Sequence, residues 1–240
     1  MATVDTQQPN PVCIGCDIGQ IHDPSAVCVA EVSQVSTGKF RYDRRVRVPA
    51  HVDDHLIFHK AVDAEPVLRS EYTIRHIARL PLNTSYPAVA EYLANLLCNP
   101  LFAHRDVRCL LDVTGVGRGV YDLLRQEVSL REAAKHVQVK PITFSHGEKY
   151  NRSTGVLAKA FLVSRLQSLL QAGRVHGPDT KEMQATLDEL KVYEIKLNND
   201  GADQYGAFKT GTHDDLATAL GLAVLTDPWS ERVMYSQRVY

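Results

Sequence analysis

Val12-Cys-Ile-Gly-Cys-Asp17 is an apolar run that ends in a carboxylate, and the rest of the chain is best interpreted from it. Two distant segments have related forms: Leu110-Leu-Asp112 also ends an apolar run, and Asp214-Asp215 opens one. Only folding can bring these segments together. Carboxylates that converge resist ionisation unless a cation lies between them. Hard oxygen donors suit Mg²⁺ or Mn²⁺, so the pattern predicts a metal-dependent enzyme acting on phosphate esters.

Composition is that of an ordinary globular protein. The chain has 240 residues, 44% of them hydrophobic and 23% charged, with a net charge of −1. No global basic field indicates nucleic acid, so any DNA contact must come from local clusters of Lys and Arg. No apolar stretch is long enough to span a membrane, and the N-terminus has no signal-peptide pattern. We expect one domain over residues 12–228, with a disordered lead at 1–11 and a tail at 229–240.

The five cysteines are odd in number and most lie inside apolar runs, which favours buried free thiols in a reducing compartment. Cys13 and Cys16 form a C-x-x-C pattern. Because they are three residues apart on a predicted strand, their side chains should point to opposite faces of the sheet. We therefore expect neither a shared metal nor a disulfide from this pair.

Periodicity and turn residues predict three antiparallel strands followed by alternating helices and strands. The result is an α/β fold with a mixed sheet and helices on both of its faces. The predicted strands are Val12–Asp17, Ala26–Val32, Lys39–Val48, Arg108–Val113 and Val137–Phe144, and Glu71–Leu80 is expected to be extended. The predicted helices are Tyr86–Leu97, Arg118–Gln126, Leu157–Ala172, Met183–Leu190 and Asp214–Leu225. Residues 49–66 are assigned to an irregular insertion. Val192–Leu197 and Gln204–Lys209 are assigned to a hairpin that would act as a flap or form an ordinary sheet edge.

This order of elements, with acidic residues at these positions, resembles the RNase H-like superfamily. Three motifs resemble more narrowly the nuclease domain of phage large terminases: Gly15-Cys-Asp-Ile-Gly-Gln-Ile-His-Asp-Pro-Ser-Ala26, Leu111-Asp-Val-Thr-Gly-Val-Gly117 and Gly211-Thr-His-Asp-Asp-Leu216. Leu157–Val163 and Leu170–Val175 share the resemblance, which extends from Val12 to Leu225. It implies a metal-dependent endonuclease that cuts concatemeric viral DNA during genome packaging, with low sequence specificity.

The resemblance implies hydrolysis of a phosphodiester with two Mg²⁺ or Mn²⁺ ions held by Asp17, Asp112, Asp214 and Asp215. Asp17 would bridge both ions and Asp112 would hold one. Adjacent helical residues diverge by about 100°, so only one of the last pair can point well at a given ion. Asp215 is the preferred direct ligand, and Asp214 would act behind it, bind the second ion or cap the helix.

Supporting roles are assigned to residues near these carboxylates. His213 would orient a carboxylate or water, or be an idle surface histidine. Lys159 would hold the scissile phosphate or the attacking water, or simply be solvated. For Asp23 a turn-forming role is favoured over metal binding. DNA contacts of the non-specific, phosphate type are assigned to Arg118, Lys149, Arg152, Lys159 and Arg165.

Large terminases normally carry an ATPase motor before this domain. Gly38-Lys39 is the only Gly-Lys pair, and Ser33 and Phe40 stand where a Walker loop requires Gly and Ser or Thr. The motor is thus absent from this chain, which is expected to be either an excised nuclease domain or a stand-alone nuclease. The implied partners are double-stranded DNA, the motor domain, the small terminase and the portal protein, with no membrane. The isolated domain is expected to be a monomer in the cytoplasm of an infected or lysogenic bacterium.

Two other classes of function remain open. Another RNase H-like nuclease, such as a Holliday-junction resolvase or an RNase H, would share the carboxylates but prefer branched DNA or an RNA–DNA hybrid. A non-catalytic DNA-packaging module would carry a degenerate site, whereas here every acidic position is occupied.

Overall fold

The computed structural model describes residues 9–19, 23–42, 64–129, 131, 134, 136–145, 149–194 and 214–230. Within them, eight strands form one mixed sheet in the order β6-β7-β5-β4-β1-β2-β3-β8. The strands are β1 (Val12–Asp17), β2 (Ala26–Tyr42), β3 (Ala64–Arg79), β4 (Val107–Asp112), β5 (Val137–Ser145), β6 (Tyr150–Asn151), β7 (Val156–Ala158) and β8 (Val175–His176). The helices are α1 (Tyr86–Leu97), α2 (Gly117–Ser129), α3 (Lys159–Gln171), α4 (Lys181–Glu194) and α5 (Asp215–Ala223), with a 3₁₀ turn η1 at Pro100–Phe102.

The sheet has two halves that meet at β1. On one side β1, β2 and β3 pair in antiparallel fashion, and on the other β4 and β5 run parallel to β1. The α/β class and the mixed sheet predicted from sequence are therefore confirmed. The short strands β6, β7 and β8 were not predicted, because two or three residues carry no readable alternation.

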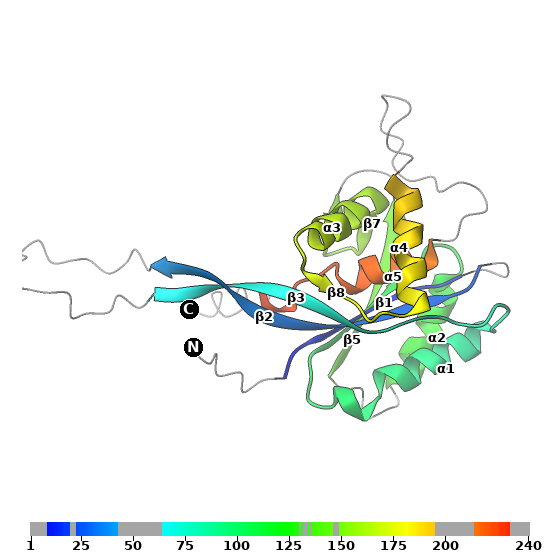
Figure 1. The fold of residues 1–240 in the computed structure, drawn as a ribbon. Coiled ribbons are helices and arrows are strands. Elements are labelled where there is room, and N and C mark those ends of the chain that lie inside the picture. The colour runs from blue at the N-terminus through cyan, green and yellow to red at the C-terminus, as the bar shows by residue number, and fades with distance from the viewer. Residues whose placement is uncertain are drawn as a thin grey trace, which may run out of the picture.

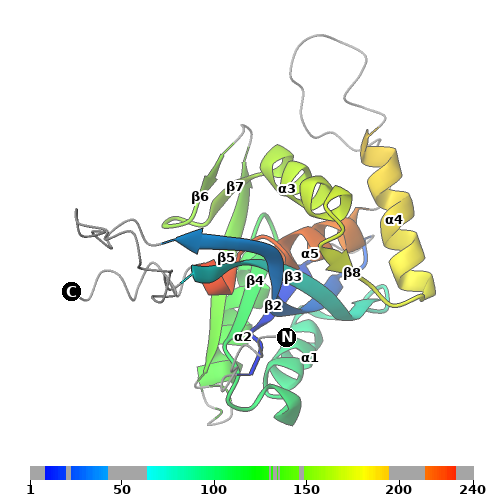
Figure 2. The same ribbon diagram turned by 60° about the vertical axis from the view of Figure 1, so that its left-hand side comes forward.

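Helices cover both faces of the sheet (Figures 1 and 2). Alternate residues of β1 point to opposite sides: Ile14 and Cys16 join a core cluster with α1 and α2, while Cys13 joins one with α3, α4 and α5. This separates Cys13 from Cys16 as predicted, and all five cysteines are free thiols. None of the described helices has the length and apolar character needed to cross a bilayer.

Helix α5 lies directly on the central strand because β1 has a glycine there. A Cβ atom on Gly15 would stand 2.1 Å from the carbonyl oxygen of Ala219 and 2.5 Å from the nitrogen of Ala223. Contact this close between a strand and helix backbone is open only to glycine. The packing brings the N-terminus of α5 to the end of β1 where Asp17 lies, and all nine residues of α5 are buried.

The third antiparallel strand is not the one predicted. Lys39–Tyr42 continues β2 instead of starting a new strand, and the third strand is β3. Between Ser36 and Phe40 the chain has a polar sequence that suggests a turn. In the structure this segment is a shift in the pairing register of β2 and β3, and Gly38 within it has a φ of +73°. Such a bulge keeps two strands paired through an irregular sequence. Beyond the core, β2 and β3 project as a two-stranded ribbon (Figure 1).

Two further boundaries differ from the sequence expectation. Val192–Glu194 is the last turn of α4, not the start of a hairpin, and residues 195–213 lie outside the described residues. The predicted lead and tail also make contacts with the domain: the side chain of Asn10 donates to Glu31 at 3.0 Å, and the indole of Trp229 donates to the carbonyl of Val32 at 2.9 Å. The irregular insertion falls mostly on residues 43–63, which are not described, and Ala64–Pro66 begins β3.

Candidate active site

Asp17 and Asp112 end neighbouring parallel strands, so both lie at the same edge of the sheet. The last paired residues before them are Cys16 and Leu111. Asp214 and Asp215 arrive at this edge from the N-terminus of α5. All four carboxylates line one pocket of about 350 Å³ together with Asp23 and Lys159. Folding thus brings together the acidic segments identified in the sequence.

Asp17 lies at the centre of this arrangement. Burial raises the pKa of its carboxyl well above the usual value, and the charges of Asp112 and Asp214 raise it further. The ammonium of Lys159 lowers that pKa, and Asp215 raises it by the smallest of these effects. Within the described residues, no hydrogen-bond donor contacts the Asp17 carboxylate. A nearby cation favours the ionised form of a carboxylate placed in this way.

Asp112 is held by the loop that follows it. The backbone N–H of Thr114 donates to its carboxylate at 2.7 Å, and the Thr114 hydroxyl accepts from the N–H of Phe144 in β5. Burial raises the pKa of Asp112, against the lowering effects of Thr114 and Lys159. The loop then turns so sharply that a Cβ atom on Gly117 would lie 2.0 Å from the Asp112 carbonyl oxygen. This glycine-containing segment therefore serves to place Asp112.

The adjacent residues Asp214 and Asp215 have different partners. Asp214 is the N-cap residue of α5, yet its side chain makes no capping bond; its carboxylate pairs with the ammonium of Lys159. Asp215 is bound by the guanidinium of Arg79, with Nε 2.6 Å from Oδ2. Both aspartates line the pocket, each with a cation of its own as partner. The preference for Asp215 as the direct metal ligand stays a prediction, and its partner Arg79 is not readable from local sequence.

Lys159 enters the site from the first turn of α3. Besides pairing with Asp214, its ammonium lies 5.7 Å from the centre of the Phe144 ring. A positive charge in the first turn opposes the helix dipole, so the surrounding carboxylates and the ring account for its placement. Lys159 is the single cation that lines the pocket in the described part of the chain.

The other predicted site residues are distributed differently. Arg118, Lys149 and Arg152 are exposed; Arg118 lies over the ring of Tyr121 at 5.6 Å. Arg165 is turned into the protein, where it donates to the carbonyl of Val224 at 2.8 Å. That contact ties α3 to the end of α5, and the DNA-binding role of Arg165 stays a prediction. His213 lies outside the described residues.

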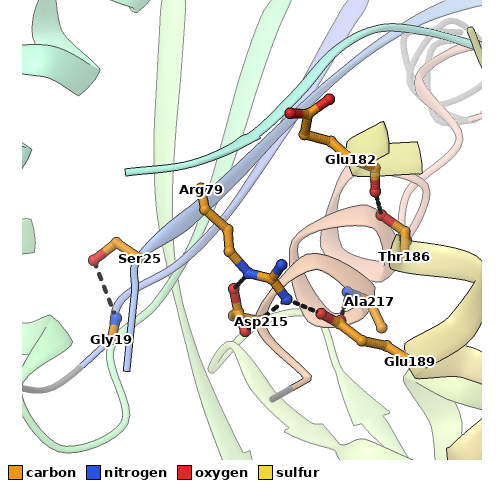
Figure 3. A network of polar contacts seen from close by, with 8 residues as sticks. All are labelled: Gly19, Ser25, Arg79, Glu182, Thr186, Glu189, Asp215 and Ala217. Atoms are coloured by element: carbon orange, nitrogen blue, oxygen red, sulfur yellow. Dashed lines mark hydrogen bonds and ion pairs between the residues drawn. The ribbon is translucent and has the colours of Figure 1, made fainter. Parts of the chain in front are cut away.

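Asp23 belongs to a tight loop beside the site. A Cβ atom on Gly19 would lie 2.0 Å from the carbonyl oxygen of Asp23, and the N–H of Gly19 donates to the hydroxyl of Ser25 at 3.1 Å (Figure 3). The predicted turn at this segment agrees with that geometry. Asp23 also lines the carboxylate pocket.

Sequence reasoning missed Arg79 and Glu189. Glu189, on α4, pairs with Arg79 on β3, and both lie beside Asp215 (Figure 3). A weak signal for Glu189 was available. Met183, Thr186 and Glu189 recur every three residues along α4 and are all buried, so the carboxylate stands on the apolar stripe of its helix. Its partner Arg79 lies 110 positions earlier in the chain, and no local sequence pattern predicts this pairing.

The donor set fits a hard divalent cation. The pocket supplies carboxylate oxygens, which Mg²⁺ and Mn²⁺ prefer, and the partly exposed Asp17 carboxyl accepts no hydrogen bond from the described residues. Among the described residues no three acidic, histidine or cysteine side chains stand in a ready-made metal geometry. In this arrangement the Lys159 ammonium supplies the positive charge at Asp214.

A larger hollow elsewhere is a weaker candidate for chemistry. It measures about 550 Å³ at the base of the β2–β3 ribbon and includes Arg69, Arg174, Asp227 and Trp229 in its lining. Its carboxylate at Asp227 already accepts from the hydroxyl of Ser70 at 2.7 Å. The carboxylate pocket has the converging acidic groups, and this hollow does not.

Comparison with known proteins identifies the family. Residues 77–226 match the model of the terminase RNase H-like domain. The fold is similar to the large terminase nuclease of the thermophilic phage G20c, at 20% identity over 89% of this chain and 81% of that one, with a TM-score of 0.49. It is also similar to a human cytomegalovirus terminase nuclease domain, Mn-soaked and inhibitor-bound, at 12% identity over 96% and 89% of the two chains, with a TM-score of 0.50.

No curated protein sequence matches the chain. The family match covers more than half of the chain, including Asp112, Asp214 and Asp215, and the RNase H-like fold agrees with it. The chain belongs to the terminase RNase H-like domain family.

Proposed function

We propose that this chain is a divalent-metal-dependent endonuclease that cuts double-stranded DNA during viral genome packaging. The observation that carries the proposal is the convergence of Asp17, Asp112 and Asp214 on one pocket, with the pKa of Asp17 raised by burial and by the other two. Family membership supplies the context of packaging. The Mn-soaked cytomegalovirus domain supports the choice of metal.

In the proposed mechanism Asp17 and Asp112 hold the ions from the strand ends, and Asp214 completes the set from α5. When bound, a pair of Mg²⁺ or Mn²⁺ ions would supply an activated water and stabilise the leaving 3′ oxygen. Lys159, which pairs with Asp214 in the structure, would bind the scissile phosphate or orient the attacking water. Thr114 keeps Asp112 in place through its backbone N–H.

DNA would approach across the exposed basic residues next to the pocket. Lys149 neighbours the start of α3, because its carbonyl accepts from the N–H of Ala158 at 2.9 Å. Arg118 opens α2 directly after the Asp112 loop. Arg152 lies in the turn between β6 and β7. Contacts of this kind bind phosphates and confer little sequence preference, which suits a packaging nuclease.

The proposal includes the wider assembly. The ATPase motor, the small terminase and the portal protein would act as partners, and the site of action would be the cytoplasm of the infected bacterium. The motor would hold DNA near the site, since the net charge of −1 gives the isolated chain weak, salt-sensitive binding.

The direct test is cleavage of supercoiled plasmid in Mn²⁺, Mg²⁺ or EDTA by the wild type and Asp17→Ala. Asp179→Asn, at an exposed aspartate before α4, is the matched control. We expect metal-dependent nicking and linearisation by the wild type and control, and loss of cleavage in Asp17→Ala. A folded wild type that cleaves with no metal would overturn the proposal, as would activity that persists in Asp17→Ala.

Substrate choice separates this nuclease from its nearest alternatives. The same assay with a four-way junction and an RNA–DNA hybrid should show slower cleavage than with linear or plasmid duplex. Strong preference for the junction would instead indicate a resolvase, and strong preference for the hybrid an RNase H.

A further inference from the structure

The N-terminus of α5 is capped from another helix. Asp214 occupies the N-cap position with φ −133° and ψ 15°, but its side chain makes no capping bond. The N–H of Ala217, in the first turn of α5, instead donates to the Glu189 carboxylate of α4 at 2.8 Å (Figure 3). An aspartate at the N-cap ordinarily accepts this bond itself. Glu189 therefore performs the capping that Asp214 would otherwise perform.

Because Glu189 caps α5, the Asp214 carboxylate is not used for capping and can point into the carboxylate pocket. An aspartate that accepts from its own helix turns back over the helix end and uses one of its oxygens there. Asp214 reaches across to Lys159 instead. The side chain that faces Asp17 and Asp112 is thus free to do so because a residue of α4 satisfies the helix.

Arg79 joins the cap to the neighbouring aspartate. One of its terminal nitrogens pairs with Glu189 and its Nε lies 2.6 Å from Asp215 (Figure 3). The two carboxylate side chains are each only 8% exposed, while Arg79 is 33% exposed. The rigid fork of a guanidinium suits two carboxylates at fixed angles. The start of α5 is therefore fixed by α4 through Glu189 and by β3 through Arg79.

Arg79 stands on the same cross-strand row as Asp17. Asp17 pairs with Ala26 of β2, and Ala26 pairs with Arg79 of β3. Neighbouring strands are held by their backbone hydrogen bonds, so this row is a stiff part of the sheet. The contact from Arg79 to Asp215 consequently sets the position of the α5 terminus relative to the end of β1.

We propose that Arg79 and Glu189 are positioning residues for the metal centre, and the proposal rests on the metal-dependent function proposed above. Neither side chain lines the carboxylate pocket. Together they orient α5 so that Asp214 faces Asp17 and Asp112 while Asp215 is held back. Residues that orient metal ligands in this way typically contribute 10- to 100-fold to metal affinity.

The variants are Glu189→Ala, Glu189→Gln and Arg79→Met. Glu189→Ala removes the cap and the partner of Arg79. Glu189→Gln keeps an amide oxygen that accepts from Ala217 but loses the charge opposite Arg79. Asp188→Asn is the matched control, because Asp188 is the next residue on the same helix, 61% exposed, and pairs only with solvent-exposed groups of α4.

Two measurements are made on each variant. Mn²⁺ binding is followed by isothermal titration calorimetry, and hydrogen exchange of the Ala217 amide reports the cap without metal or DNA. We expect Mn²⁺ affinity to fall by about 10- to 100-fold in Glu189→Ala and Arg79→Met. Glu189→Gln should lose less, and Asp188→Asn should bind as the wild type does. The Ala217 amide should exchange faster in Glu189→Ala than in the wild type. In Glu189→Gln and Asp188→Asn it should exchange at the wild-type rate.

A purely structural role gives a different result. Glu189→Ala and Arg79→Met would then melt at lower temperature in EDTA but bind Mn²⁺ with wild-type affinity, which would overturn the proposal. If Glu189→Ala does not fold, the affinity of Glu189→Gln decides, since wild-type affinity in that variant and in Arg79→Met also overturns it. Failure of the proposed metal-dependent function would give a different result from failure of the positioning role. In that case the wild type would bind Mn²⁺ no better than Asp17→Ala.

Discussion

Replacing Asp17 by Asn should stabilise the metal-free protein while abolishing cleavage. The substitution keeps the size of the side chain and removes its charge. Burial and the charges of Asp112, Asp214 and Asp215 all raise the pKa of Asp17, and the nearby Lys159 ammonium lowers it. Without a metal, the ionised carboxylate therefore destabilises the fold at neutral pH.

The size of the stabilisation expected for Asp17→Asn follows from these opposing effects on the Asp17 carboxylate. A single stabilising substitution, such as one that optimises charge, commonly contributes about 0.5–2 kcal/mol. For a chain of this size, each kcal/mol shifts the melting temperature by roughly 2–4 °C. We take about 1 kcal/mol, because Lys159 already offsets part of the repulsion. Asp17→Asn should then melt about 2–4 °C above the wild type in EDTA at pH 7.5.

The pH dependence of the difference has a definite sign. A carboxyl whose pKa is higher in the folded state than its ordinary 3.8 binds its proton more tightly when folded. The stability contributed by that proton is fully present below about pH 3.8 and is lost as pH rises through the folded-state pKa. The advantage of Asp17→Asn should therefore be small in acid and grow toward neutral pH.

The assay is thermal unfolding monitored by circular dichroism, in EDTA and in Mn²⁺, from pH 4.5 to 8. In Mn²⁺ the order should reverse, because only the wild type binds the ion through Asp17 and is stabilised by it. An Asp17→Asn protein that melts below the wild type in EDTA at pH 7.5 would refute the reasoning. So would an advantage that shrinks as pH rises.

Two further predictions concern neighbours of the same site. Lys159→Gln removes the cation paired with Asp214, so it should lower the melting temperature in EDTA by about 2–8 °C, from a loss of roughly 1–2 kcal/mol; an unchanged melting temperature would contradict the assigned role. Gly117→Ala should destabilise the fold and weaken Mn²⁺ binding, since its Cβ would meet the carbonyl of Asp112 at 2.0 Å. Gly119→Ala, whose Cβ meets nothing within 4 Å, should instead be neutral or stabilise α2 by up to about 1 kcal/mol; equal denaturation midpoints for the two variants would exclude the steric argument.

The elements that were predicted well are those with complete local signals. Helix α1 begins at Tyr86 and ends at Leu97 as expected, because Ser85 accepts from the N–H of Ala88 and a proline stands in the first turn. The core strands β1 and β4 were recognisable as apolar runs ended by a carboxylate. The bulged continuation of β2 through Gly38 was not, because pairing with β3 overrides the turn preference of a short polar stretch.

Sequence alone determined that Asp17, Asp112 and the Asp214–Asp215 pair belong to one acidic site, because strand ends and a helix start are local features with readable patterns. Only the tertiary structure decided which partner each group at the start of α5 contacts. Asp215 is held by Arg79, 136 positions away, and α5 is capped by Glu189 of α4, 28 positions before Ala217. Local propensity cannot encode these partners, since ion pairs between distant elements exist only after β3, α4 and α5 have packed together.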